Sequence, residues 1–228
     1  MREIVLDTET TGLDPEAGHR IVEVACLELA HHIPTGQTFR RYLNPQREMP
    51  EDARAVHGLD DTFLAQQPLF ADVADEFLAF IADTPLIIHN AQFDLKFLNA
   101  ELTRIDRAPL DAERAVDTVA MARRRFPGAQ ASLDALCRRF GIDNTARTLH
   151  GALLDCELLA EVYLELRGGR QPGLNLSAAQ RAAEAIDAPA GTIPARPARP
   201  ARAHGPSVEE SAAHEAMLAR LKAPIWRR

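Results

Sequence analysis

Acidic residues occur in this sequence where a buried strand is expected to end. Asp7 and Glu9 flank Thr8 directly after an apolar run that begins at residue 3. Alternate residues of a strand point to the same face, so the two carboxylates should lie side by side. Neighbouring carboxylates repel each other unless a hard divalent cation, which prefers oxygen ligands, lies between them. A solvated strand end is the alternative explanation, and this pair alone does not exclude it.

Two further acids lie near the starts of expected helices. Asp94 lies one turn into a helix that follows the apolar segment 85–89. Asp155 lies in the second turn of a helix expected over 152–167, and His150 stands just before that helix. Each has an ordinary explanation, because an acid near a helix N-terminus can compensate the helix dipole and a histidine beside a glycine can belong to a loop. Taken singly, none of the three identifies a site.

Hydrophobic periodicity predicts the elements that position these groups. Apolar runs predict four strands, at 3–7, 21–29, about 36–43 and 85–89. Apolar residues at helical spacing predict helices at 70–81, from about 92, and at about 117–125, 132–139 and 152–167. Pro34, Thr35 and Gly36 predict a turn between the second and third strands, which would make an antiparallel meander. Ser132 is the expected N-cap of the helix that follows it.

The charge of the chain limits how it could hold a nucleic acid. The formal net charge is −7, and residues 1–169 carry 28 acidic against 17 basic side chains. A protein that binds nucleic acid through a broad surface is usually basic. If residues 1–169 act on a polyanion, bound cations or a partner protein must therefore supply the attraction.

The cysteines and the apolar runs indicate the kind of environment. Cys26, Cys137 and Cys156 have apolar neighbours and lack metal-ligand spacing, which favours buried, reduced thiols in a cytoplasmic protein. No apolar run approaches the roughly 20 residues that span a bilayer, so no membrane partner is expected.

The chain changes character after Gly169. Residues 187–206 repeat Ala-Arg-Pro and offer little to bury, so residues 170–206 are expected to form a flexible linker. Ser207 and Glu210 then open a short helix. Trp226 is the one tryptophan of the chain, and such an aromatic in a tail favours an anchor for another protein. We therefore expect a catalytic domain at 1–169, a linker at 170–206 and a docking segment at 207–228.

The order and context of the acidic segments resemble the histidine-bearing branch of the DEDD 3′→5′ exonucleases. The matching segments are 4–13, 89–94 and 150–155, and the resemblance covers about residues 3–167. It implies an α/β, ribonuclease H-like fold with a mixed five-stranded sheet and surrounding helices. Segments 56–59, 132–137, 142–144 and 147–150 are similar to proofreading members of the family, which remove mispaired nucleotides from the 3′ end of nascent DNA.

The resemblance implies a role for each candidate residue. The implied ligands of two divalent cations, Mg²⁺ or Mn²⁺, are Asp7, Glu9, Asp94 and Asp155. His150 is the implied general base, which takes a proton from the attacking water. The implied contacts to the terminal nucleotide are Asp7, Glu9, Asp52, His57 and Asp155. Glu51 could replace Asp52 in this role, and either Leu13 or Phe93 could wedge against a base.

The resemblance also implies partners in addition to a single-stranded or frayed DNA 3′ end. Residues 171–176 resemble the Gln-x-x-Leu-x-Leu type of peptide that binds a sliding clamp, through Gln171, Leu174 and Leu176. The tail with Trp226 would dock on a polymerase subunit, and the catalytic domain would meet a small third subunit. Two alternatives stay open, namely an RNA-trimming exonuclease of the same family and a non-catalytic scaffold subunit.

Overall fold

A computed structural model describes residues 1–169 and 205–220 of the chain. The chain divides into two compact units, Met1–Asn175 and Leu176–Arg228. In the described part of the second unit, helix α9 (Val208–Ala219) has Ser207 as its N-cap, and the Ser207 side chain accepts a hydrogen bond from the Glu210 N–H. The short helix expected after Ser207 is therefore present.

The first unit is built on one mixed sheet of five strands, as expected. The strands are β1 (Arg2–Thr10), β2 (Ile21–Ala30), β3 (Ile33–Tyr42), β4 (Leu86–Ile88) and β5 (Ala115–Asp117). They lie in the order β3-β2-β1-β4-β5. β1 and β3 pair antiparallel with β2, whereas β4 pairs parallel with both β1 and β5. β5 was not among the strands expected from apolar runs, because Ala115–Asp117 is not an apolar run.

Helices cover both faces of this sheet. They are α1 (Glu51–His57), α2 (Asp61–Leu64), α3 (Phe70–Ile81), α4 (Ala91–Arg104), α5 (Thr118–Arg125), α6 (Leu133–Phe140) and α7 (Ala152–Leu166). Five of them were expected, and Ser132 caps α6 by accepting a hydrogen bond from the Ala135 N–H. The short helices α1 and α2 were not predicted. The described helices include none that is long and apolar enough to cross a membrane.

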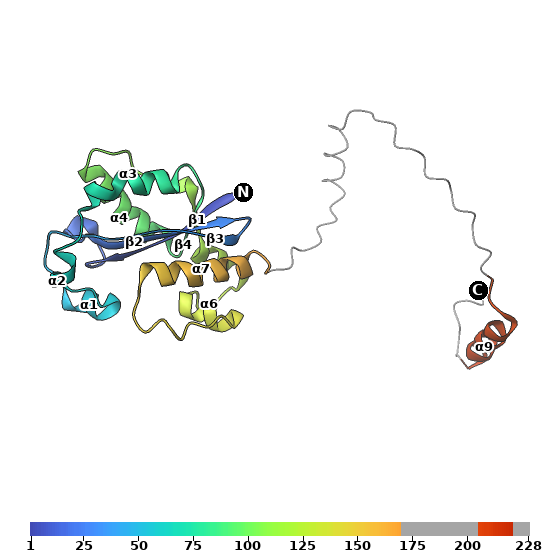
Figure 1. The fold of residues 1–228 in the computed structure, drawn as a ribbon. Coiled ribbons are helices and arrows are strands. Elements are labelled where there is room, and N and C mark those ends of the chain that lie inside the picture. Colours follow the sequence, from blue (N-terminus) through green and yellow to red (C-terminus); the bar gives the residue numbers. More distant parts are fainter. Residues whose placement is uncertain (170–204, 221–228) are drawn as a thin grey trace, which may run out of the picture. The chain divides into compact units, whose positions relative to one another are not determined.

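The side chains of β1 alternate between two hydrophobic cores. Ile4 and Leu6 pack with residues of α3 and α4, while Val5 packs with residues of α7 on the opposite face. Figure 1 shows α3 and α4 on one side of the sheet and α6 and α7 on the other. Because successive residues of a strand face opposite ways, this alternation also decides which helix each polar residue at the end of β1 approaches.

The turn expected at residues 34–36 was wrong. β2 ends at Ala30 and β3 begins at Ile33, so His31 and His32 form the connection. Both histidines have positive φ, of 53° and 67°, which is the backbone of the tight two-residue turns that join twisted antiparallel strands. Pro34 lies inside β3, and the sheet tolerates it there because β3 is an edge strand.

The environment of the cysteines agrees with the sequence. Cys26, Cys137 and Cys156 are all buried and free of disulfide bonds. Their sulfur atoms belong to the apolar cores, which is where small, weakly polar side chains are most often found.

Candidate active site

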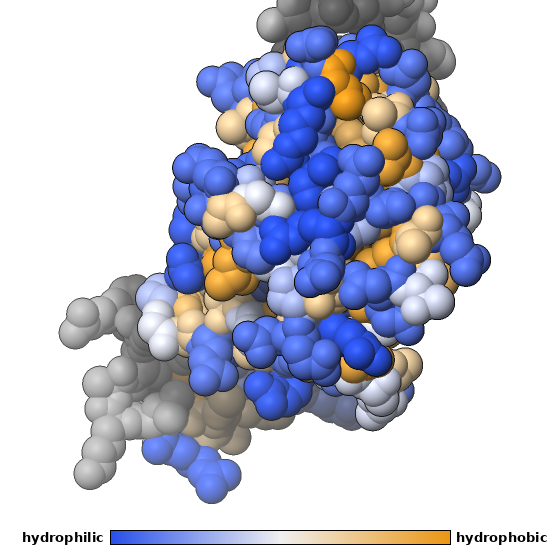
Figure 2. Space-filling view, turned by 90° about the vertical axis from the view of Figure 1, so that its left-hand side faces the viewer, coloured by the Kyte–Doolittle hydropathy of each residue, from blue (hydrophilic) through white to orange (hydrophobic). Residues whose placement is uncertain are grey.

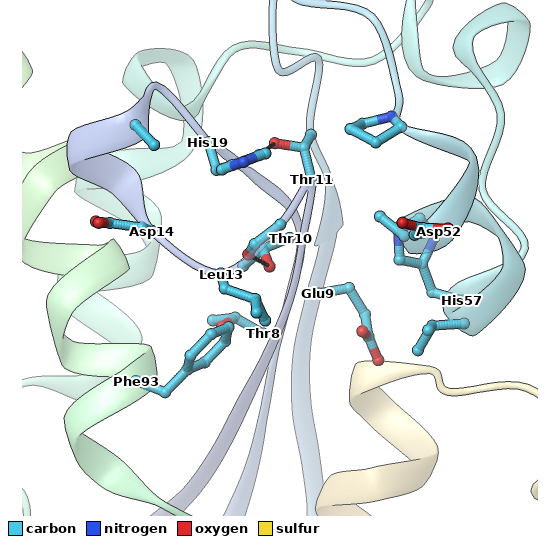
Figure 3. Close-up of a pocket in the computed structure, with 15 residues that line it drawn as sticks. Thr8, Glu9, Thr10, Thr11, Leu13, Asp14, His19, Asp52, His57 and Phe93 are labelled. Atoms are coloured by element: carbon cyan, nitrogen blue, oxygen red, sulfur yellow. Dashed lines mark hydrogen bonds between the residues drawn. The ribbon is translucent and has the colours of Figure 1, made fainter.

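The polar end of β1 presents side chains to both faces of the sheet. Asp7 and Glu9 share the face of Val5 and therefore approach α7, whereas Thr8 faces α4. Figure 3 shows this divergence, with Glu9 directed toward the helix that carries Asp155 and Thr8 directed toward the helix that carries Phe93. One strand thus supplies polar groups to two helices at the same end of the sheet.

Asp94 is a buried residue of the first turn of α4, with 2% of its surface exposed. The Thr8 hydroxyl donates a hydrogen bond of 2.7 Å to Asp94 Oδ1. Burial raises the pKa of Asp94 to about 7, although the hydrogen bond from Thr8 opposes this shift. A surface acid that merely compensates the helix dipole would be solvated, so that explanation does not describe Asp94.

Asp155 comes from the first turn of α7, slightly earlier in the helix than expected, and is 5% exposed. Ligand atoms of Glu9, His150 and Asp155 lie within 4.8 Å of one another, a separation at which they can share one metal ion. His150 is exposed, and its Nδ1 lies 3.5 Å from Asp155 Oδ2. The structure therefore brings together the histidine and two of the acids that the sequence singled out.

The acidic side chains at this end of the sheet repel one another. Burial raises the pKa of Asp7 well above its ordinary value, and repulsion from Asp94, Glu9 and Asp155 raises it further. Burial also raises the pKa of Glu9 to about 8, with contributions from Asp155 and Glu23. Buried carboxylates that destabilise one another become favourable ligands when hard cations are bound between them, so the donor set fits divalent metal ions.

Glu23 links the sheet to the start of α7. It lies opposite Glu9 in the β1–β2 pairing and is 1% exposed. Its carboxylate accepts hydrogen bonds from Arg40 Nε at 2.7 Å and from the Ala152 N–H at 3.3 Å. Sequence reasoning missed Glu23, although a charged residue inside the apolar run 21–29 was a usable signal.

Arg147 is a second residue that sequence reasoning did not single out. It lies between α6 and α7, and its guanidinium contacts Asp155, Asp134 and His150. The signal available was only its place in segment 147–150. Its significance depends on partners that the fold brings near it.

A cavity of about 560 Å³ opens beside Glu9. Among the residues that line it are Thr10, Leu13, Asp52, His57 and Phe93 (Figure 3). Asp52 lines this cavity, whereas the adjacent Glu51 does not line it and instead places its Oε2 atom 3.6 Å from Arg54 Nη1. The position of Asp52 therefore suits a substrate contact better than that of Glu51. Leu13, 84% exposed, and Phe93, half-buried, both present apolar surface to the cavity.

A hydrogen bond to His57 defines the tautomer of its neutral ring. Its Nδ1 accepts a hydrogen bond of 3.1 Å from the Leu59 N–H, so the proton of a neutral ring lies on Nε2. Nε2 is buried and has no hydrogen-bond partner of ordinary geometry. Burial lowers the pKa of His57, and the nearby Thr10 backbone partly offsets this effect. His57 lines the cavity, and Nε2 is the donor nitrogen of its neutral ring.

The surface at this end of the molecule is mainly polar. Figure 2 views the side on which α1 and α2 lie, and shows hydrophobic side chains scattered among hydrophilic ones. The remaining candidates, Gln171, Leu174, Leu176 and Trp226, lie outside the described residues.

Known proteins are similar to this chain in sequence and in fold. Residues 4–163 match the family model described as Exonuclease. DNA polymerase III subunit epsilon of Rickettsia felis is 55% identical over 179 residues, covering 77% of this chain and 78% of that protein. The subunit of the same name from Escherichia coli is 47% identical over 176 residues, covering 74% and 72%. The structure of exonuclease X with 5′ overhanging duplex DNA has a TM-score of 0.58 at 25% identity, covering 72% of this chain and 90% of that one.

Proposed function

The chain belongs to the exonuclease family, and from this premise we propose that it is the proofreading subunit of a DNA polymerase III. In that role it is a 3′→5′ exonuclease that removes mispaired nucleotides from the 3′ end of nascent DNA. The identity of 47–55% to subunits named epsilon, over about three quarters of the chain, supports this role.

The observation that carries the proposal is the convergence of acids and an imidazole at one end of the sheet. The groups come from β1, α4, α7 and the segment before α7, and they are Asp7, Glu9, Asp94, His150 and Asp155. The repulsion among the acids and the closeness of Glu9, His150 and Asp155 support their assignment to one site. A scaffold subunit without catalytic activity would have no need to retain so unfavourable a group of charges.

Exonucleases of this family use divalent metal ions, and the oxygen-rich cluster suits them. We assign the binding of two cations to Asp7, Glu9, Asp94 and Asp155, with Mg²⁺ as the natural ion and Mn²⁺ as a substitute. Such cations neutralise the phosphoryl oxygens and ease the deprotonation of the attacking water. The Thr8 hydroxyl holds Asp94 against β1.

His150 is the proposed general base. Its imidazole lies beside Glu9 and Asp155 on the segment that leads into α7. An imidazole accepts protons efficiently near neutral pH, so His150 can take the proton of the water that attacks the terminal phosphodiester.

The cavity beside Glu9 is the proposed site of the 3′-terminal nucleotide. Asp52 and the Nε2–H of His57 offer polar contacts, while Leu13 and Phe93 offer apolar surface to a base. Asp7, Glu9 and Asp155 would contact the terminal nucleotide from the metal side. These contacts do not read base identity, which suits the removal of any frayed or single-stranded 3′ nucleotide.

Partners complete the proposal. We assign Trp226 and segment 207–228 to docking on the polymerase III alpha subunit, and Gln171, Leu174 and Leu176 in the linker 170–206 to the sliding clamp beta. A theta-like subunit would bind the exonuclease domain 1–169. We place the protein in the cytoplasm, with the DNA it serves.

The substrate is tested by degradation of a 3′-mispaired primer–template and of short RNA, each in Mg²⁺ and in EDTA. We expect Mg²⁺-dependent release of nucleoside monophosphates from the DNA, and slower release from RNA. Faster degradation of RNA would favour the RNA-trimming alternative. No release from DNA would contradict the proofreading role.

The metal assignment is tested by the substitution Asp7→Asn. We expect the activity to fall by at least about a hundredfold, because a ligand of the reaction centre is lost. The melting temperature in EDTA should not fall, since the change removes a charge that repels three neighbours. Asp75→Asn, at an exposed position in α3 paired with Arg107, is the matched control and should keep full activity. An active Asp7→Asn variant would contradict the assignment.

A further inference from the structure

Arg147 makes an unusual set of contacts for a residue beside a metal-binding cluster. Its side chain is 8% exposed. Nε and Nη2 each donate a hydrogen bond of 2.6 Å to a different oxygen of Asp155. We propose that Arg147 is an internal counter-ion that competes with a divalent cation for Asp155 and, while it does so, keeps His150 from acting as a base.

The contact between Arg147 and Asp155 is among the strongest that two side chains make at neutral pH. A guanidinium matches a carboxylate in a two-bond, fork-like geometry, and hydrogen bonds between charged groups are short and strong. Both oxygens of Asp155 are engaged in this way. A cation that binds Asp155 through either oxygen must therefore displace at least one of these bonds.

The same guanidinium also reaches His150. Arg147 Nη2 lies 3.0 Å from His150 Nδ1. Arginine has only donors, so this contact uses the lone pair of Nδ1 and leaves the proton of a neutral ring on Nε2. In this arrangement neither ring nitrogen has a free lone pair for a proton from water. Release of Arg147 would thus free a metal ligand and a base together.

Arg147 has another partner to which it can remain bound. Its Nη1 donates a hydrogen bond of 2.9 Å to Asp134 Oδ1 in α6, and that side chain is about half exposed. The guanidinium can turn toward Asp134 and solvent without becoming a buried, unpaired charge, which would be costly. A return to Asp155 restores the arrangement seen here.

Competition of this kind has a thermodynamic signature. A group that occupies a ligand before the cation arrives lowers the cation's apparent affinity, so removal of that group must raise it. A residue that merely supports the ligand would have the opposite effect, because its loss disorders the site. The inference rests on the metal-binding role proposed above for Asp155, and the direction of the change in affinity decides it.

The experiment measures the dissociation constant for Mn²⁺ by calorimetry with the full-length protein. The variants are Arg147→Met, Arg147→Lys and, as matched control, Arg138→Met at an exposed position in α6. We expect Arg147→Met to bind Mn²⁺ about tenfold more tightly than wild type, since a charge-assisted pair is lost from the competing state. Arg147→Lys, which keeps the charge but not the fork, should be intermediate, and Arg138→Met should be unchanged.

A second measurement needs no stable variant. In ¹H–¹⁵N spectra of the wild-type protein, the Arg147 Nε–H signal should move on addition of Mg²⁺ as its bond to Asp155 is broken. Weaker or unchanged Mn²⁺ binding by Arg147→Met, or an unmoved Nε–H signal while wild type binds metal, would overturn the inference and leave the proposed function intact. Failure of the wild type to bind Mn²⁺ at all would overturn both.

Discussion

At the scale of single residues, the site is an unfavourable arrangement held in place by the fold. Glu9 and Asp94 are buried, and burial is the largest cause of the raised pKa of each. Such carboxyl groups take up protons where ordinary ones have lost them. Protons and metal ions are therefore alternative ways of neutralising the same cluster.

A pH-dependence of stability follows from these shifts. The pKa of Glu9 rises from 4.5 to about 8, and that of Asp94 from 3.8 to about 7. A raised pKa in the folded state contributes stability that is present at low pH and lost as the pH rises through the raised value. In EDTA, the melting temperature should therefore fall as the pH rises from about 5 to about 8, as scanning calorimetry can measure. Mg²⁺ should reduce this fall in melting temperature, and the substitution Glu9→Gln should make it smaller. A wild-type melting temperature that does not change with pH in EDTA would contradict the raised pKa values of Glu9 and Asp94.

Which of these residues could be predicted depends on how far away their partners lie in the sequence. Asp7, Glu9, Asp94, His150 and Asp155 could be proposed because each lies in a recognisable local segment. Glu23 stands out in the sequence as a charged residue inside an apolar run, but its role could not be predicted, because its contact with Ala152 spans 129 residues and exists only once α7 packs on the sheet. Local sequence patterns indicate where strands end and helices start. A buried contact between a strand and a helix forms only when the two elements pack together.

At the scale of elements, α7 must be held in register with β1 for the site to exist. The buried carboxylate of Glu23 provides one such link, from β2 to the first N–H of α7. Arg40, in the edge strand β3, pairs with that carboxylate from the other side. The edge strand therefore takes part in positioning Asp155 without touching it.

Removal of Arg40 tests this link. Arg40→Ala leaves the Glu23 carboxylate buried without its ion-pair partner, so we expect the free energy of unfolding to fall by about 1–3 kcal/mol in urea denaturation. Glu23→Gln in the same background should recover part of the loss, because it removes the unpaired charge. Arg41→Ala, which breaks a pair with the exposed Glu76, should cost only about 0–1 kcal/mol. Equal losses for the Arg40 and Arg41 variants would show that the pair does not support α7.

Elements differed in how well the sequence predicted them. The long periodic segments, such as Phe70–Ile81 and Ala152–Leu166, were predicted almost to the residue. β5 was missed because Ala115–Asp117 is not an apolar run. The helices α1 and α2 were missed because they have too few residues to show a helical period. The β2–β3 turn was misplaced because Pro34 and Gly36 favour turns in isolation but are tolerated in an edge strand.

At the scale of the whole molecule, an acidic catalytic unit must work on a polyanion. The excess of acids in residues 1–169 opposes tight binding to free DNA. Tethering to a polymerase and a clamp would raise the effective concentration of the site at a primer end without requiring affinity for DNA itself. Weak binding to free DNA would also limit the degradation of correctly paired ends.

Truncation separates these contributions. Residues 1–169 hold the described hydrophobic cores around the sheet, so this fragment should fold and keep its activity on free single strands. Fragment 1–206 should bind the clamp but not the polymerase subunit, and fragment 1–169 should bind neither, as measured by analytical gel filtration. Trp226→Ala in the full chain should reproduce the loss of polymerase binding. Polymerase binding by fragment 1–206 would place the docking surface elsewhere.

The unequal lengths of the central strands have a mechanical consequence. β1 runs on to Thr10, whereas its pairing with β4 is at Ile4 and Val5. The last residues of β1 therefore pair with β2 along one edge only. On one face of the sheet, the Thr8 hydroxyl also donates a hydrogen bond to Asp94. Small changes of twist in the β2–β3 hairpin should therefore shift Asp7 and Glu9, which pair with β2. Changes in β4 and β5 should reach this end of β1 less directly, through the Thr8–Asp94 hydrogen bond and the packing of Leu6 against α3 and α4.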